Sequence, residues 1–180
     1  MGQVEQTVHD NGITVEIKSA KLYGMSKTGS WNTNDGWTTD AATKTELGSP
    51  LTEVTNKKLN IIDETNNKNE NEKVDLFADD NVILLIPQNI PDRYETTNPF
   101  IFHIEYTYSD YPNDVHKAYI NLGTVSTLLT KWEAGKSYRY TFTIGAEDYI
   151  FFAAPDVETW KENEIGGDDR LDKENQENQD

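Results

Sequence analysis

The chain has 180 residues, no cysteine, and a formal net charge of −16 from 32 acidic and 16 basic side chains. This length suits one domain with ragged ends. The charge argues against nucleic acid and anionic membrane surfaces as partners, because both would repel the chain. The lack of cysteine excludes disulfides, thiolate metal sites and thiol catalysis. No apolar run approaches the ~20 residues of a membrane helix, so we expect no membrane insertion of this segment.

The first strand signal follows a short N-terminal stretch. Residues 1–12 have no basic start, apolar stretch or cleavage site, so they are no signal peptide. We interpret them as an N-terminal arm or an expression remnant, and expect the natural N-terminus to lie upstream; the sequence leaves open whether a preceding domain and a lipoprotein signal belong there. From Ile13 to Ile17 apolar residues alternate with polar ones, and the apolar phase then slips to Ala20 and Leu22. This slip predicts a strand with a bulge near Ser19.

The next segment reads as a long polar loop. Residues 23–50 are rich in Gly, Ser, Thr, Asn and Asp, and they contain Trp31 and Trp37. The stretch from Asn32 to Gly36 comes near a calcium loop, but Trp31 stands where the first oxygen ligand belongs. A solvated turn is therefore the better interpretation.

Weaker signals follow before residue 100. Residues 59–62 and 74–77 predict short edge strands. Residues 63–73 have no apolar side chain and predict a solvated loop. The run Val82 to Ile86 is continuously apolar and is ended by Pro87. This pattern predicts a strand buried on both faces.

The clearest strand lies at residues 100–108. Its apolar set points one way and its mixed set the other; the apolar set is Phe100, Phe102, Ile104, Tyr106 and Tyr108. Residues 116–122 alternate in the same manner. A strand with one apolar and one polar face belongs in an antiparallel sheet with one wet side.

The last strands lie between residues 138 and 154. Residues 138–144 alternate, 145–148 resemble a hairpin connection, and 150–154 are short and apolar. After Trp160 the tail 161–180 is acidic and polar, and we expect disorder there. Seven to eight short strands with polar turns predict an all-β antiparallel sandwich of immunoglobulin type over residues 13–160.

Catalytic and metal signals are weak. His9, His103 and His116 show no spacing that would bring two of them together with a carboxylate, so we expect no metal site. There is no Gly-x-Ser-x-Gly elbow and no glycine-rich phosphate loop. A glycosidase needs two carboxylates at a defined separation, which 32 scattered ones do not indicate. We therefore expect no enzyme and no cofactor.

Aromatic side chains supply the candidate ligand-binding residues. Exposed aromatics in loops are better binding candidates than aromatics in strands, which favours Trp31 and Trp37 as sugar-stacking platforms. The tyrosines of the strands, Tyr106, Tyr108, Tyr111 and Tyr119, are better explained by core packing with the hydroxyl at the rim.

Two further stretches form a recognisable pair. The first is Val82-Ile83-Leu84-Leu85-Ile86-Pro87-Gln88, an apolar strand that ends in Pro-Gln. The second, some 45 residues later, is Trp132-Glu-Ala-Gly135-Lys136-Ser-Tyr138-Arg-Tyr140, followed by an alternating strand. Gly135 permits a tight turn, Trp132 can cover the end of the sandwich, and the tyrosines start the next strand. Together they resemble the C-terminal domain of fimbrillin-like proteins, over roughly residues 13–160.

The resemblance implies a transthyretin-like β-sandwich and a structural role. Fimbrillin-like proteins are pilus subunits on the outer surface of Gram-negative bacteria, and they assemble by donating a β-strand from one subunit to the next. The expected partners are other pilus subunits, with host or bacterial glycans as further ligands. The chain departs from the family in carrying one domain instead of two, no signal peptide, and a tail too polar to be a donor strand. The alternative is a carbohydrate-binding or adhesin module that does not polymerise.

Overall fold

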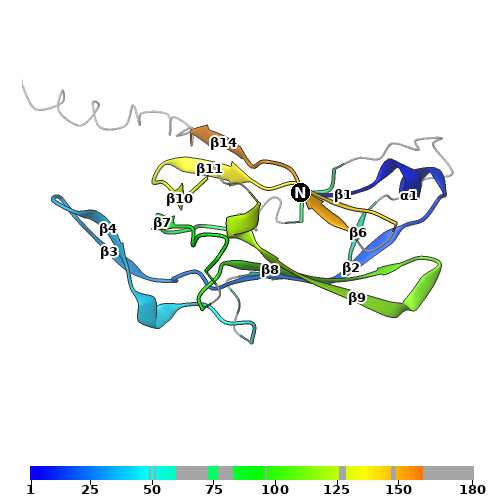
Figure 1. Ribbon diagram of the computed structural model, residues 1–180, viewed down its shortest axis with the longest axis horizontal. Coiled ribbons are helices and arrows are strands. Elements are labelled where there is room, and N and C mark those ends of the chain that lie inside the picture. The colour runs from blue at the N-terminus through cyan, green and yellow to red at the C-terminus, as the bar shows by residue number, and fades with distance from the viewer. Residues whose placement is uncertain are drawn as a thin grey trace, which may run out of the picture.

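The computed structural model describes residues 1–48, 50, 52–59, 73–76, 83–95, 97–125, 129–146 and 149–159. These residues form an all-β fold in which most strand pairs are antiparallel. Figure 1 shows one long sheet on one side and a layer of shorter strands on the other, which together make a sandwich. The predicted fold class is confirmed. The polar tail 161–180 lies outside the described residues.

The long sheet has five strands in which β8 is central. Its main strands are β2 (Val15–Tyr23), β8 (Ile101–Tyr108) and β9 (Tyr111–Asn121). Two short strands, β5 (Thr52–Val54) and β6 (Lys57–Leu59), pair with successive parts of β2. The edge strand expected at 59–62 is thus seen up to Leu59, and residues 60–62 lie outside the described part of the chain.

The alternation in β8 produces the faces that the sequence predicts. The apolar set is buried: Phe100, Phe102, Ile104, Tyr106 and Tyr108. The opposite set contains His103 and Glu105, which pair across the sheet with Tyr119 and Lys117 of β9. The predicted alternation of 116–122 is also seen, because Ala118 and Ile120 pack against the core and Leu122 is buried in the short 3-10 turn Leu122–Thr124.

The predicted bulge in β2 is confirmed. The register against β8 shifts between Ile17 and Ser19. Because of the extra residue, Val15 and Ile17 before the bulge and Ala20 after it are all fully buried. The bulge therefore keeps the apolar side chains on the core side although their sequence phase changes.

The second layer is assembled from short strands. Its members are β1 (Gly2–Val4), β7 (Gln88–Asn89), β10 (Lys131–Trp132), β11 (Lys136–Arg139), β12 (Phe142–Ile144), β13 (Ile150–Phe152) and β14 (Asp156–Thr159). They pair as β1-β12-β13, β10-β7 and β11-β14. The layer packs on the long sheet through aromatic contacts, in which the Phe102 ring lies 5.4 Å from that of Phe142 and 5.8 Å from that of Phe152.

The strand expected over residues 138–144 is divided in two. It breaks at Tyr140 and Thr141, because β11 pairs with β14 whereas β12 pairs with β1 and β13. The turn expected at 145–148 joins β12 to β13, although residues 147 and 148 are not among those described.

The N-terminal residues belong to the sandwich instead of forming a loose arm. β1 runs parallel to β12, and the short helix α1 (Gln6–Asp10) follows it. Val4 and Val8 are each only 1% exposed, so both are part of the core. On its other side Gly2 forms a two-way backbone bridge with Val74, within the segment expected as an edge strand at 74–77.

The prediction of a buried strand from Val82 to Ile86 is wrong. Residues 83–87 belong to no strand, Leu84 is 79% exposed, and the ladder begins only at Gln88. A run of apolar residues shows that side chains can be buried, but it does not show whether a neighbouring strand is present to bond with the backbone. Val82 lies outside the described residues.

None of the described helices is long and apolar enough to cross a membrane.

Replacing Gly2 with valine should displace β1. A Cβ at this position would lie 2.7 Å from Cζ of Phe142 and 3.2 Å from the Leu59 methyl groups. We expect a loss of about 1–3 kcal/mol in the free energy of unfolding, measured by urea denaturation. The neighbouring change Gln3→Val is the control, because Gln3 is only half-buried and should tolerate it. Equal stability of both variants would show that β1 does not fit as described.

Candidate functional site

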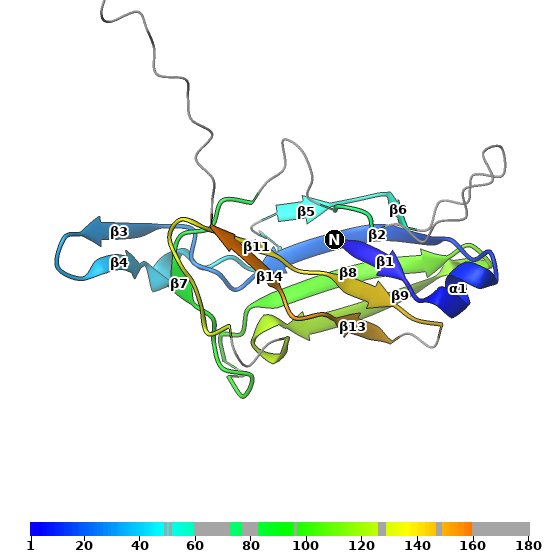
Figure 2. The same cartoon turned by 90° about the horizontal axis from the view of Figure 1, so that it is seen from above.

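The segment expected as a long loop contains a β-hairpin. β3 (Gly29–Asn32) pairs antiparallel with β4 (Gly36–Thr39), in the middle of residues 23–50. Figure 2 shows the hairpin extending beyond both layers at one end of the molecule, with α1 at the opposite end. Nearly every residue of the two strands is exposed, so the hairpin is held by its ladder and its base and not by core packing.

The hairpin places the two predicted ligand-binding residues side by side. Trp31 and Trp37 are direct partners in the ladder, and directly opposite residues project from the same face of a sheet. Trp31 is 60% exposed and Trp37 is 43% exposed. The next pair on this face is Gly29 and Thr39, whereas Ser30 and Thr38 pair on the other face. We call the side that carries the indoles the tryptophan face.

The turn of the hairpin is closed by polar side chains. The Oδ1 atom of Asn32 accepts hydrogen bonds from the backbone N–H groups of Asn34 and Asp35, at 2.9 and 2.8 Å. Gly36, the first residue of β4, has a φ of +73°, a left-handed conformation that favours glycine. The stretch that approached a calcium loop in sequence is therefore this turn, as predicted.

The base of the hairpin is fastened by a second set of contacts. The N–H of Asp40 donates to the Thr28 carbonyl at 3.0 Å, and the hydroxyl groups of Thr28 and Thr43 lie 2.8 Å apart. Asp40 also caps the 3-10 turn Ala41–Thr43 by accepting from the N–H of Ala42. The two strands thus remain paired down to the sandwich.

The two halves of the family-like motif meet in space. Gln88 in β7 and Trp132 in β10 are direct ladder partners, although 44 positions separate them. Both side chains are buried. The Gln88 amide accepts from the N–H of Ser26 at 3.0 Å and donates to the carbonyls of Ser26 and Ile86. Gln88 therefore ties the start of the hairpin segment to the second layer.

Trp132 closes one end of the core. Its ring stacks on Phe100 with centroids 5.2 Å apart, and its Nε1 donates to the Tyr140 hydroxyl at 3.0 Å. Burial raises the pKa of Tyr140 to about 12, so the phenol stays protonated. The Tyr138 hydroxyl accepts from the N–H of Glu133 at 2.7 Å. These aromatic residues act in packing, and their hydroxyl groups satisfy neighbouring polar atoms.

The remaining motif residues shape the turn and its flanks. Gly135 has a φ of +69° between β10 and β11, which explains a glycine there. The Nζ atom of Lys136 donates to the Thr159 hydroxyl on β14 at 3.1 Å. Pro87 is half-buried directly before β7.

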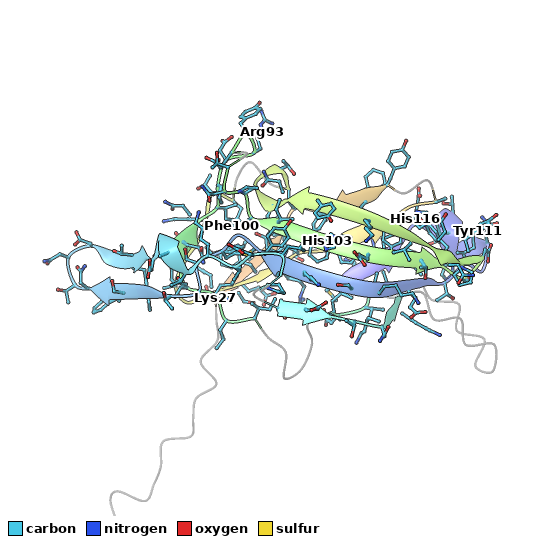
Figure 3. The ribbon with its side chains drawn as sticks, turned by 90° about the horizontal axis from the view of Figure 1, so that it is seen from below. Lys27, Arg93, Phe100, His103, Tyr111 and His116 are labelled. Atoms are coloured by element: carbon cyan, nitrogen blue, oxygen red, sulfur yellow. The ribbon has the colours of Figure 1, made fainter. Side chains whose placement is uncertain are left out.

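The three histidines do not converge. His103 pairs with Tyr119 whereas His116 pairs with Tyr106, and positions 103 and 106 lie on opposite faces of β8. Figure 3 shows His103 near the middle of the long sheet and His116 toward the end that carries Tyr111. In the described ranges no three His, Asp or Glu side chains form a group able to hold a metal ion.

His103 is buried although it lies on the outer face of the sheet. It is 3% exposed, and neither ring nitrogen has a hydrogen-bond partner. Tyr119 stacks over the ring with centroids 4.3 Å apart, and Oε1 of Glu105 is 3.7 Å from Nε2. Desolvation lowers the pKa of His103, against the attraction of Glu105. Sequence alone did not indicate this burial, because the covering ring of Tyr119 comes from the neighbouring strand β9.

The strand tyrosines divide into two classes. Tyr106 and Tyr108 are buried in the core, as predicted, whereas Tyr111 and Tyr119 are more than half exposed. Tyr111 lies at the β8–β9 turn, far from the tryptophan face (Figure 3). The tyrosines and the tryptophans therefore do not form one surface.

The chain matches no protein-family model, no curated protein and no solved structure.

Replacing Gln88 with leucine should loosen the base of the hairpin. The change keeps the side-chain size but leaves the buried N–H of Ser26 without its acceptor. We expect the free energy of unfolding to fall by about 1–3 kcal/mol. We also expect faster exchange of the Ser26 amide hydrogen, measured by NMR. Asn89→Leu, at the exposed neighbour, is the control and should leave that exchange rate unchanged. Unchanged exchange in Q88L would contradict the role of Gln88.

Replacing His103 with phenylalanine should stabilise the protein, most strongly in mild acid. The phenyl ring retains the stack on Tyr119 and removes two nitrogens that have no hydrogen-bond partner. We therefore expect the free energy of unfolding to rise by about 1 kcal/mol at neutral pH. Since the pKa is lowered by folding, the unfolded chain binds the proton more readily. The wild type should therefore lose stability relative to H103F as the pH falls below about 6.5. Melting curves of both proteins between about pH 5 and 8 measure the difference in stability. A difference that does not change with pH would contradict the lowered pKa of His103.

Proposed function

We propose that this chain is a structural or accessory subunit of a cell-surface pilus of a Gram-negative bacterium, with a mechanical and not an enzymatic role. It assembles with other pilus subunits through donation of a β-strand. The fimbrillin-like motif supports this proposal, because its two halves pair directly at Gln88 and Trp132. The sandwich fold is also the kind of scaffold that strand donation requires.

The observation that carries the proposal is the position of β1. This strand lies between β12 and the Val74 bridge, so it has backbone partners on both sides. Its N–H and C=O groups at Gly2 both bond to Val74, at 2.7 Å each. β1 therefore fills a slot in the second layer in the same way as a donated strand would.

The side chains of β1 also have the alternation that a donor needs. Gly2 and Val4 face the core, and Gln3 between them faces outward and donates to the Thr143 hydroxyl at 2.9 Å. Gly2 fits where no side chain would, directly against Phe142 and Leu59. The side chains of Gly2–Val4 thus match the slot in both size and apolar character, whereas the tail 161–180 is too polar to do so. We assign the donor role to this segment and the acceptor role to the slot beside β12.

The exchange costs little interaction energy when the intramolecular and intermolecular strands are equivalent. A neighbour's Gly2–Val4 segment makes the same ladder with Phe142–Ile144, so the interactions of one joint equal those of the closed monomer. The second layer is built of short strands, so removal of β1 disrupts one local ladder and leaves the long sheet intact. Once formed, such a joint dissociates slowly and withstands detergent without heat.

A disulfide across β1 and β12 tests the proposal. Because the chain has no cysteine, the double variant Gln3→Cys/Thr143→Cys has a single pair of thiols, at adjacent ladder positions. Oxidation of the isolated monomer, before it assembles, should hold β1 in its own slot and prevent detergent-resistant ladders on unboiled gels. Reduction should restore the ladders. Two samples are compared on the gels: protein extracted from the surface of the native host, and a concentrated solution of the purified chain.

The matched control is the double variant Ser30→Cys/Thr38→Cys. This pair lies opposite each other in the β3–β4 hairpin, so its disulfide leaves β1 free and should allow ladders in both redox states. Mixing the single variants Gln3→Cys and Thr143→Cys should yield a disulfide-linked dimer. A wild-type chain that is monomeric under every condition, or ladders from the β1 variant oxidised as a monomer, would refute strand donation through this slot.

A further inference from the structure

The tryptophan face of the β3–β4 hairpin carries a pair of exposed aromatic side chains. Trp31 and Trp37 project from the same side of a two-stranded ribbon that extends beyond the sandwich (Figure 2). Contact with an apolar surface would remove a large apolar area of each indole from water, which is favourable. Two such rings at a protruding tip indicate a contact with another molecule.

The backbone that carries the two rings is held in place before any ligand arrives. The turn is fastened by the Asn32 hydrogen bonds and the left-handed Gly36. The base is fastened by the Thr28–Thr43 contact and the Asp40 bond to Thr28. A rigid platform loses little conformational entropy on binding, which favours weak ligands that make few contacts.

The area of the platform is too small for a stable protein partner. A fully buried tryptophan covers about 150–250 Å². At exposures of 60% and 43%, the two indoles together offer roughly one such side chain. A specific protein interface needs about 800 Å² from each partner. The exposed area suits a ligand the size of one or two small rings.

The charge of the hairpin restricts the ligand further. Residues 29–40 contain Asp35 and Asp40 but no Lys, Arg or His. Phosphate, sulfate and carboxylate groups would therefore meet no counter-charge within the two strands and their turn, where the only charges are negative. A quaternary ammonium group prefers aromatic rings on several sides, whereas a two-stranded ribbon presents its rings side by side on one face.

We propose that the tryptophan face binds an uncharged saccharide, with a pyranose ring stacked on each indole. The C–H groups on one side of a pyranose are apolar and pack against an aromatic face, while its hydroxyl groups stay hydrated or bond to polar neighbours. Thr39 lies on the same face and supplies such a polar group, and the surrounding residues are mostly Ser, Thr and Asn. This binding goes beyond strand donation and does not depend on it, because the hairpin and β1 are separate elements.

Affinity electrophoresis of the purified full chain tests this proposal. The native gels contain a soluble neutral polysaccharide: a β-glucan, a galactomannan or glycogen. At least one should retard the wild type, and the variants Trp31→Ala and Trp37→Ala should each weaken the affinity by roughly tenfold or more. Trp31→Tyr, which keeps an aromatic face, should retain part of the affinity.

The matched control is Ser30→Ala/Thr38→Ala, on the opposite face of the same hairpin. This variant should be retarded like the wild type. Melting curves should show that the tryptophan variants stay folded, because both indoles are largely exposed. Gels with polygalacturonate and competition with choline test an anionic glycan and a quaternary ammonium ligand.

Four outcomes would overturn the proposal. The first is that no neutral polysaccharide retards the wild type. The second is retardation that persists in the tryptophan variants, and the third is preferential binding of polygalacturonate or choline. The fourth is that W31A and W37A abolish self-association, measured by light scattering, without affecting retardation, which would make a second copy the occupant. The disulfide experiment on β1 is unaffected by any of these results, so the two proposals fail separately.

Discussion

The structure depends on the alternation of apolar side chains along β8. Every second residue from Phe102 to Tyr108 faces the second layer, and β2 and β9 bond to the two edges of this strand. A slip of one residue in either ladder would turn a row of buried side chains toward water. The register of β8 therefore decides which face of the long sheet is core and where His103 lies.

The second layer follows a different principle. Its strands are two to four residues long and several of their partners are distant in sequence, as with Gln88 and Trp132 or Gly2 and Phe142. Short strands contribute little individually, so strands such as β1, β10 and β12 are held by the packing of their buried side chains in the core. A layer of this kind can exchange one strand without unfolding the rest, which is the physical basis of the proposed assembly through β1.

Prediction from the sequence succeeded where a local pattern carried the information. The period of two located β8, and the change of phase located the bulge in β2. It failed at Val82 to Ile86, where apolar residues have no strand partner and Leu84 is exposed. It missed the β3–β4 hairpin, although the Asn32 and Gly36 turn signals between two tryptophans could have indicated it. It also missed β1, because three residues are too few for a periodic signal.

The sequence by itself determined the all-β class, the faces of the long strands, the polar turn of the hairpin and the choice of Trp31 and Trp37 as exposed aromatics. These properties depend on neighbours within a few residues, where alternation and glycine have direct physical meanings. Only the tertiary structure decided that the two indoles share one face, that Gln88 meets Trp132, that β1 fills a slot beside β12, and that His103 is buried without partners. Those outcomes depend on pairing between distant segments, and no local preference specifies which strand lies beside which.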